Sequence, residues 1–111
     1  MASSADLVAY IAEQLGGEVA GVSYRKMFGE YGFYREGKFF SVVCDDAFFI
    51  KPTQAGRVFL ETRGLLLEAP PYDGAKDYFL IENVDDTTLL QSLSEVTLAE
   101  LPLPKPKKPK K

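Results

Sequence analysis

Residues 25–34 read Arg25-Lys26-Met27-Phe28-Gly29-Glu30-Tyr31-Gly32-Phe33-Tyr34. Aromatic side chains surround two glycines here, and glycine permits backbone bends and close approaches that other residues resist. We therefore expect residues 29–32 to form a turn or bulge that shapes a β-sheet. Met27 and Phe28 suit either a place in the core or an exposed adhesive patch, because Met beside aromatic residues also favours adaptable surfaces.

Short strands and short turns follow this motif along the chain. Glu36-Gly37-Lys38 is typical of a tight hairpin turn between strands at residues 33–35 and 39–44. After a break at Asp45-Asp46, residues 47–51 are expected to form the next strand. A short strand is also expected at residues 22–27, where the motif begins. Parallel neighbours would need long crossover connections, so the spacing predicts an antiparallel meander.

Three helices and two further strands are expected around this meander. The apolar spacing and the capping residues predict helices at residues 3–15, at residues 54–62 with Thr53 as the cap, and after Asp85 or Asp86. Apolar runs predict strands at residues 65–69 and 78–81. The sequence therefore predicts a two-layer α+β fold in the order α-β-β-β-α-β-β-α, with an antiparallel sheet of about five strands. One domain would cover residues 1–101.

Composition argues against catalysis. The chain has 111 residues, no histidine and one cysteine, Cys44. These counts exclude His-based nucleophile systems, His-based zinc sites and an intramolecular disulfide. Adjacent carboxylates at 45–46 and 85–86 point apart on a turn or cap, and Cys44 is expected to be a small buried strand residue. We expect no catalytic residue, no metal and no cofactor.

Charge is unevenly distributed along the chain. Five of the 13 basic residues are lysines in the last seven positions, so the rest of the chain carries a formal charge of −8. Residues 102–111 are expected to be a disordered tail, because its interleaved prolines prevent a helix and favour an extended polyproline conformation. An acidic domain repels a phosphate backbone, so nucleic-acid contact would be weak and confined to the tail lysines, Lys105, Lys107, Lys108, Lys110 and Lys111. No export or membrane-spanning signal is visible, which predicts a cytoplasmic protein.

The motif resembles the N-terminal domain of the TfoX/Sxy family, which comprises bacterial regulators of natural competence. The likeness extends from the first helix to about residue 81 and rests on the Met-Phe-Gly-x-Tyr-Gly core, the Gly37 hairpin and the downstream Lys51. It implies an α+β fold and a non-enzymatic role in transcription, acting through another protein such as the cyclic-AMP receptor protein. Longer members carry a second, helical domain, so a stand-alone domain is expected here. The positions that match are Arg25, Met27, Phe28, Gly29, Tyr31, Gly32, Tyr34, Gly37 and Lys51.

The sequence is compatible with three functions. The first is a small protein-binding module, with a homodimer as one form and with a sheet edge or a Met27/Phe28 patch as the contact surface. The second is nucleic-acid binding through the tail, aided by three basic residues if they share a face: Arg25, Lys26 and Arg35.

The third function is binding or conversion of a small ligand in a pocket between sheet and helices. Its polar groups would be Tyr31, Tyr34, Arg25 and Lys51. Tyr and Lys act as acid and base when burial shifts their pKa values. A deep pocket where these four side chains converge would favour this function, and a filled core would argue against it.

Overall fold

A computed structural model describes residues 5–27 and 30–101 of the chain. The sequence predictions for Ser3, Phe28, Gly29, the Met27 side chain and the tail at 102–111 concern parts of the chain outside the described residues. Among the described residues there are three α-helices, α1 (Ala5–Gln14), α2 (Gln54–Thr62) and α3 (Thr87–Glu100), and a short 3-10 helix, η1 (Glu18–Ala20). The six strands are β1 (Val22–Met27), β2 (Glu30–Arg35), β3 (Lys38–Cys44), β4 (Ala47–Ile50), β5 (Glu68–Ala69) and β6 (Tyr78–Ile81).

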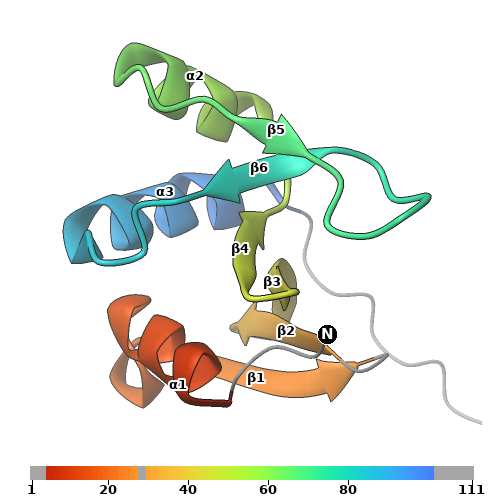
Figure 1. Cartoon of the computed structure of the whole chain (residues 1–111). Coiled ribbons are helices and arrows are strands. Elements are labelled where there is room, and N and C mark those ends of the chain that lie inside the picture. The colour runs from red at the N-terminus through yellow and green to blue at the C-terminus, as the bar shows by residue number, and fades with distance from the viewer. Residues whose placement is uncertain (1–4, 28–29, 102–111) are drawn as a thin grey trace, which may run out of the picture.

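All six strands form one antiparallel sheet in the order β1-β2-β3-β4-β6-β5 (Figure 1). The α+β class is confirmed. The sheet has one strand more than expected, and the observed order is α-β-β-β-β-α-β-β-α. The apolar run at residues 65–69 is only partly a strand, because Leu65 and Leu66 leave the ladder and pack against the core.

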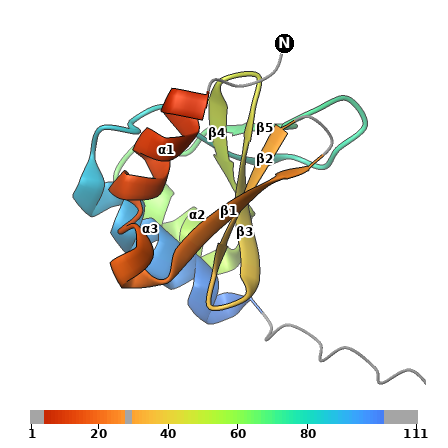
Figure 2. The same ribbon diagram turned by 90° about the horizontal axis from the view of Figure 1, so that it is seen from below.

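The α-helices lie together on one side of the sheet, as Figure 2 shows. Between the two layers lies the main core, in which aromatic rings from the sheet meet leucines from the helices. Its largest fully buried side chains include Phe33, Phe40, Phe48, Phe79, Leu60, Leu90 and Leu93. Burying a side chain of this size contributes roughly 1.5–3 kcal/mol, so this layer dominates the stability of the fold.

The expected helix caps are present at α2 and α3. Thr53 Oγ1 accepts a hydrogen bond from Gly56 N at 3.0 Å, and Asp86 Oδ1 accepts one from Leu89 N at 3.0 Å. Each cap satisfies a backbone donor that the first turn of a helix leaves unpaired. These local signals therefore located both helix starts correctly.

The hairpin turn is also where it was expected. Glu36 and Gly37 both have positive φ, at 54° and 79°, which is the backbone of the turn that best connects twisted antiparallel strands. The expected bulge is displaced, however. Gly32 lies within β2, where it pairs with Arg25 and with Val42.

The irregularity in the sheet lies in β3 instead. Phe33 pairs with Ser41, but Tyr34 pairs with Phe39, so Phe40 is an extra residue in β3. The extra residue lets Phe40 and Val43 both enter the core while Phe39 stays on the other face. Burial of a large aromatic ring, rather than glycine flexibility, explains the position of the bulge.

Candidate functional site

The face of the sheet opposite the helices, called here the open face, carries a second apolar cluster. Strand alternation turns Val42, Cys44 and Phe49 away from the main core, and each is still at least nine-tenths buried. Partly buried side chains surround these three: Phe39, Ala47, Ala69, Tyr78 and Leu80. The open face is therefore more apolar than a solvent-facing side of a two-layer sheet needs to be.

The connection between β5 and β6 runs along this open face (Figure 2). Together with β3 it encloses a groove of about 910 Å³, called here the outer groove. Tyr72 in this connection is 65% exposed, and Tyr78 at the start of β6 is half-buried. The groove is lined by Glu30, Tyr31, Phe39, Val42, Cys44, Asp45, Pro70, Pro71, Tyr72, Asp73 and Tyr78.

Two cations and two aromatic rings form a row at one end of the groove, called here the cation–aromatic row. The Arg25 guanidinium carbon lies 5.1 Å from the centroid of the Tyr34 ring. Tyr34 and Phe39 have ring centroids 5.4 Å apart, and Lys51 Nζ lies 5.0 Å from the centroid of Phe39. Such contacts hold a cation over the negative face of a ring and contribute about 0.5–1 kcal/mol at exposed sites.

The opposite end of the groove is acidic. Asp45 N donates a hydrogen bond to Glu30 Oε2 at 3.0 Å, which places the side chain of Glu30 beside the β3–β4 turn. Burial first, and then the charges of Glu30 and Asp45, raise the pKa of the Cys44 thiol. Burial likewise raises the pKa of Tyr78, with smaller contributions from Tyr72 and Cys44. The raised pKa values keep the Cys44 thiol and the Tyr78 hydroxyl in their neutral forms. Neutral side chains suit packing against a binding partner better than nucleophilic or acid–base chemistry.

The structure brings together three of the four polar residues expected to converge in a pocket. Arg25, Tyr34 and Lys51 share the cation–aromatic row, but on the surface of the open face rather than between sheet and helices. Tyr31 packs against the main core, and its ring contacts Tyr24 at a centroid distance of 6.1 Å. Packed side chains fill the space between sheet and helices, so the arrangement expected for that pocket is wrong.

The three basic residues considered for nucleic-acid contact do not share a face. Neighbours on a strand point to opposite sides, which separates Arg25 from Lys26. Arg35 pairs with Val22, whose side chain belongs to the main core, whereas Arg25 pairs with Gly32 on the other face. Cys44, in contrast, is a buried strand residue as expected.

Sequence reasoning missed the residues that join the motif into a surface. Phe39 belongs both to the cation–aromatic row and to the lining of the outer groove. Tyr72 and Tyr78 line the groove from the β5–β6 connection and the start of β6. Alternation along residues 39–44 could have revealed Val42 and Cys44, but the extra residue at Phe40 interrupts the period that such reasoning needs.

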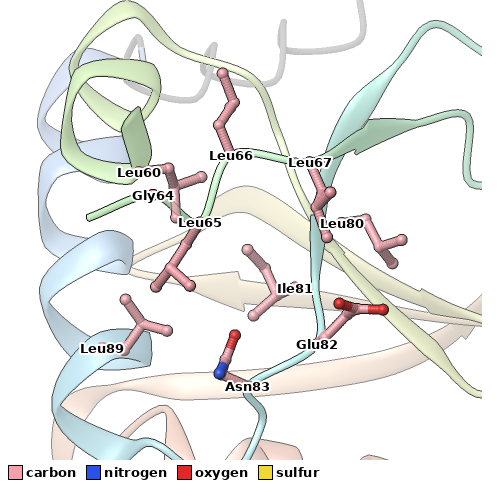
Figure 3. A pocket seen from close by; sticks show the side chains of 10 residues that line it. All are labelled: Leu60, Gly64, Leu65, Leu66, Leu67, Leu80, Ile81, Glu82, Asn83 and Leu89. Carbon is pink, nitrogen blue, oxygen red and sulfur yellow. The ribbon is translucent and has the colours of Figure 1, made fainter. Parts of the chain in front are cut away.

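A smaller hollow of about 170 Å³ lies at the other side of the fold, near the end of α2 (Figure 3). Leucines dominate its lining, and Leu65, Ile81 and Leu89 come from three separate segments. Glu82 and Asn83 are its polar side chains. This hollow is smaller than ligand pockets, which have volumes of roughly 300–1,000 Å³, so we interpret it as a packing gap beside the core.

Across residues 5–27 and 30–101, no group of three or more His, Cys, Asp or Glu side chains is placed to hold a metal ion. In the same part of the chain, every helix is too short or too polar to cross a bilayer.

Helices on one face of an antiparallel sheet and a groove on its other face define a small α+β domain with an open sheet face. The chain belongs to the TfoX N-terminal domain family, whose sequence pattern matches residues 13–100. It is also 40% identical over 111 residues to an "Uncharacterized 12.7 kDa protein in trpE 5'region" of Spirochaeta aurantia, with 99% of this chain and 93% of that protein covered.

Proposed function

We propose that this protein is a non-enzymatic binding module of the cytoplasm that acts by contact between its open face and another protein. The observation that carries the proposal is the joining of Arg25, Tyr34 and Lys51 into one row next to the outer groove. All three are positions of the family motif, and they meet through Phe39 although 26 positions separate the first from the last.

The composition of this face supports protein contact. Aromatic side chains and arginine are enriched at the centres of protein interfaces, and the aromatic rings supply contact area at a low cost in side-chain entropy. Here Arg25, Tyr34, Phe39 and Tyr72 occupy one face with apolar residues beneath them. Family membership supports a regulatory role in transcription, and the cyclic-AMP receptor protein is the partner that we propose to test first.

The test measures binding of the full chain to purified cyclic-AMP receptor protein by biolayer interferometry. The double variant Arg25→Gln, Lys51→Gln is expected to weaken binding at least about tenfold, since hot-spot residues each contribute more than about 1 kcal/mol. Arg63→Gln is the matched control, because the Arg63 guanidinium carbon also lies over a ring, 3.7 Å from the centroid of Phe59 in α2.

Three results are informative. Loss of binding in the double variant and full binding in Arg63→Gln support the open face as the contact surface. Equal losses in both variants would show that the open face is not the surface used. If the unaltered chain does not associate with the receptor protein, this choice of partner is wrong.

A further inference from the structure

The two ends of the outer groove differ in charge. Lys51 and Arg25 lie at the end where β3 begins, through their contacts with Phe39 and Tyr34. Glu30 and Asp45 lie at the end where β3 finishes, and Asp73 lines the groove from the β5–β6 connection. A ligand that lies along β3 would therefore carry no positive charge near Phe39 and would be positively charged near Asp45.

The groove walls are rich in aromatic side chains, as are the grooves that bind polyproline segments. Phe39, Tyr72 and Tyr78 provide aromatic faces, and Pro70 and Pro71 continue the wall. Segments in the polyproline II conformation dock in aromatic-lined grooves because the helix is preformed and loses little entropy on binding. Carboxylates at one end add recognition of lysine or arginine in such a segment.

The described chain ends beside the cationic end of the groove. Lys38 Nζ donates a hydrogen bond to the carbonyl oxygen of Leu98 at 2.9 Å, so the last turn of α3 lies next to the β2–β3 turn. Phe39 follows Lys38 directly and belongs to the groove. The last turn of α3 therefore lies at the end of the sheet where the groove begins.

The sequence after Leu101 begins with uncharged residues and becomes more basic toward its end. Its first residues, Pro102-Leu103-Pro104, are uncharged, and its five lysines begin at Lys105. A polyproline II segment of ten residues spans about 31 Å, at about 3.1 Å per residue. The groove runs from Phe39 to Asp45, which is about 20 Å of β-strand. The segment is thus long enough to pass the end of the sheet and reach the carboxylates.

We propose that residues 102–111 bind in the outer groove of the same molecule, with prolines against Tyr72 and Tyr78 and lysines at the acidic end. This inference rests on the proposed function, because it identifies what the open face recognises: a proline-rich segment bearing lysines. A partner protein must then displace the chain's own segment, which makes the segment a built-in competitor. A tether of this length gives an effective concentration in the millimolar range, which favours the same molecule over a second copy.

The first experiment uses the full chain with a nitroxide spin label attached at Lys110→Cys, in a Cys44→Ala background so that only one thiol reacts. The nitroxide is expected to broaden the amide signals of Glu30, Asp45 and Asp73 in ¹H–¹⁵N correlation spectra. Amides on the helix side, such as those of Tyr10 and Val58, should keep their intensity. Unlabelled Cys44→Ala provides the reference spectrum and shows whether the fold is retained.

Mixing separates the same molecule from a second copy. Spin-labelled protein without ¹⁵N is combined with ¹⁵N protein without the label, and the groove signals should stay sharp. Broadening in the mixture would assign the groove to the segment of a second copy and overturn the proposal as stated. Broadening spread evenly over the surface, or confined to the helix side, would also overturn it.

A matched variant tests recognition of the prolines. Replacing all four prolines of the labelled segment by alanine, Pro102→Ala, Pro104→Ala, Pro106→Ala and Pro109→Ala, leaves its four remaining lysines in place: Lys105, Lys107, Lys108 and Lys111. Loss of the groove broadening supports polyproline docking, and Tyr72→Ala should have the same effect. Persistence in the alanine variant would show that charge alone attracts the segment, which contradicts the proposal.

The outcome is independent of the binding experiment on the receptor protein. If the segment does not occupy the groove, the Arg25 and Lys51 variants still report on the open face as a partner surface. A gel shift with duplex DNA that requires residues 105–111, together with sharp groove signals, would instead assign the segment to nucleic acid.

Discussion

Lys38 Nζ and the carbonyl oxygen of Leu98 are 2.9 Å apart, although 60 positions separate the two residues. This bond connects the β2–β3 turn to the last turn of α3. The final carbonyls of a helix have no partner within it, and a cation there also interacts favourably with the helix dipole. The bond therefore helps to hold the end of α3 beside the sheet.

Lys38→Met should loosen the end of α3. The methionine keeps much of the apolar stem but removes the donor, so we expect a loss of about 1 kcal/mol in the free energy of unfolding. Hydrogen exchange should show faster exchange at the Leu101 amide, which donates to the carbonyl oxygen of Thr97 at 3.2 Å. Unchanged exchange in the last turn of α3 would show that the Lys38 bond does not hold this helix end.

Glu100 at the end of α3 stabilises the start of α2. Its carboxylate accepts hydrogen bonds from the amides of Ala55 and Gln54, both at 2.8 Å, and these bonds lower the pKa of Glu100 below its usual value of 4.5. The folded state favours the charged form, so the stabilisation is complete at neutral pH and disappears as the pH falls through the lowered pKa.

Glu100→Gln should therefore lower stability at neutral pH and converge with the unaltered protein in acid. Urea unfolding across this pH range measures the difference. Glu95→Gln is the control, because Glu95 is exposed on the same helix. A difference between Glu100→Gln and the unaltered protein that stays constant with pH would contradict the bonds to α2.

Thr97→Val should stabilise the fold. Thr97 is fully buried, and its hydroxyl has no hydrogen-bond partner among the described residues. An unpaired buried polar group is costly, so a valine of similar shape should raise the free energy of unfolding by about 1 kcal/mol.

Ser94→Ala is the comparison for Thr97→Val. Ser94 is equally buried on α3, but its hydroxyl donates to the carbonyl oxygen of Leu90 at 2.7 Å. This variant is expected to lose stability in the same urea measurement. A loss in both variants would mean that the Thr97 hydroxyl has a favourable interaction.

Gly56→Ala should destabilise the protein although alanine is the better helix former by about 1 kcal/mol. An added Cβ would lie 2.8 Å from Thr53 Oγ1 and 2.9 Å from Cε2 of Phe79. Neither neighbour moves freely, because the Thr53 hydroxyl caps α2 and the Phe79 ring is fully buried. Overpacking of this kind typically costs about 1–3 kcal/mol.

Thermal unfolding of Gly56→Ala should show a lower midpoint than that of the unaltered protein. Val58→Ala, at an exposed position of the same helix, should change it little. A Gly56→Ala protein as stable as the original would show that α2 can shift away from β6 at no cost.

The local features were predictable from sequence, and the open face was not. Gly37, Thr53 and Asp86 act through neighbours within three positions, so their turn and caps could be recognised. The pocket expected around Tyr31 and Tyr34 was wrong, because the two residues lie on different faces of the sheet. These two residues are three positions apart on one strand, so alternation alone places their side chains on opposite faces. In β3, by contrast, the extra residue Phe40 reverses the alternation and puts Phe39 and Val42 on the same face.

Sequence alone determined the antiparallel meander, the three helices and their class of fold, since each follows from backbone preferences and from which side chains avoid water over short spans. Tertiary structure alone decided that Arg25, Phe39 and Lys51 meet on one surface. It did so because burying the Phe40 ring stabilises the fold by more than the irregular ladder costs, and the resulting bulge turns Phe39 toward the open face.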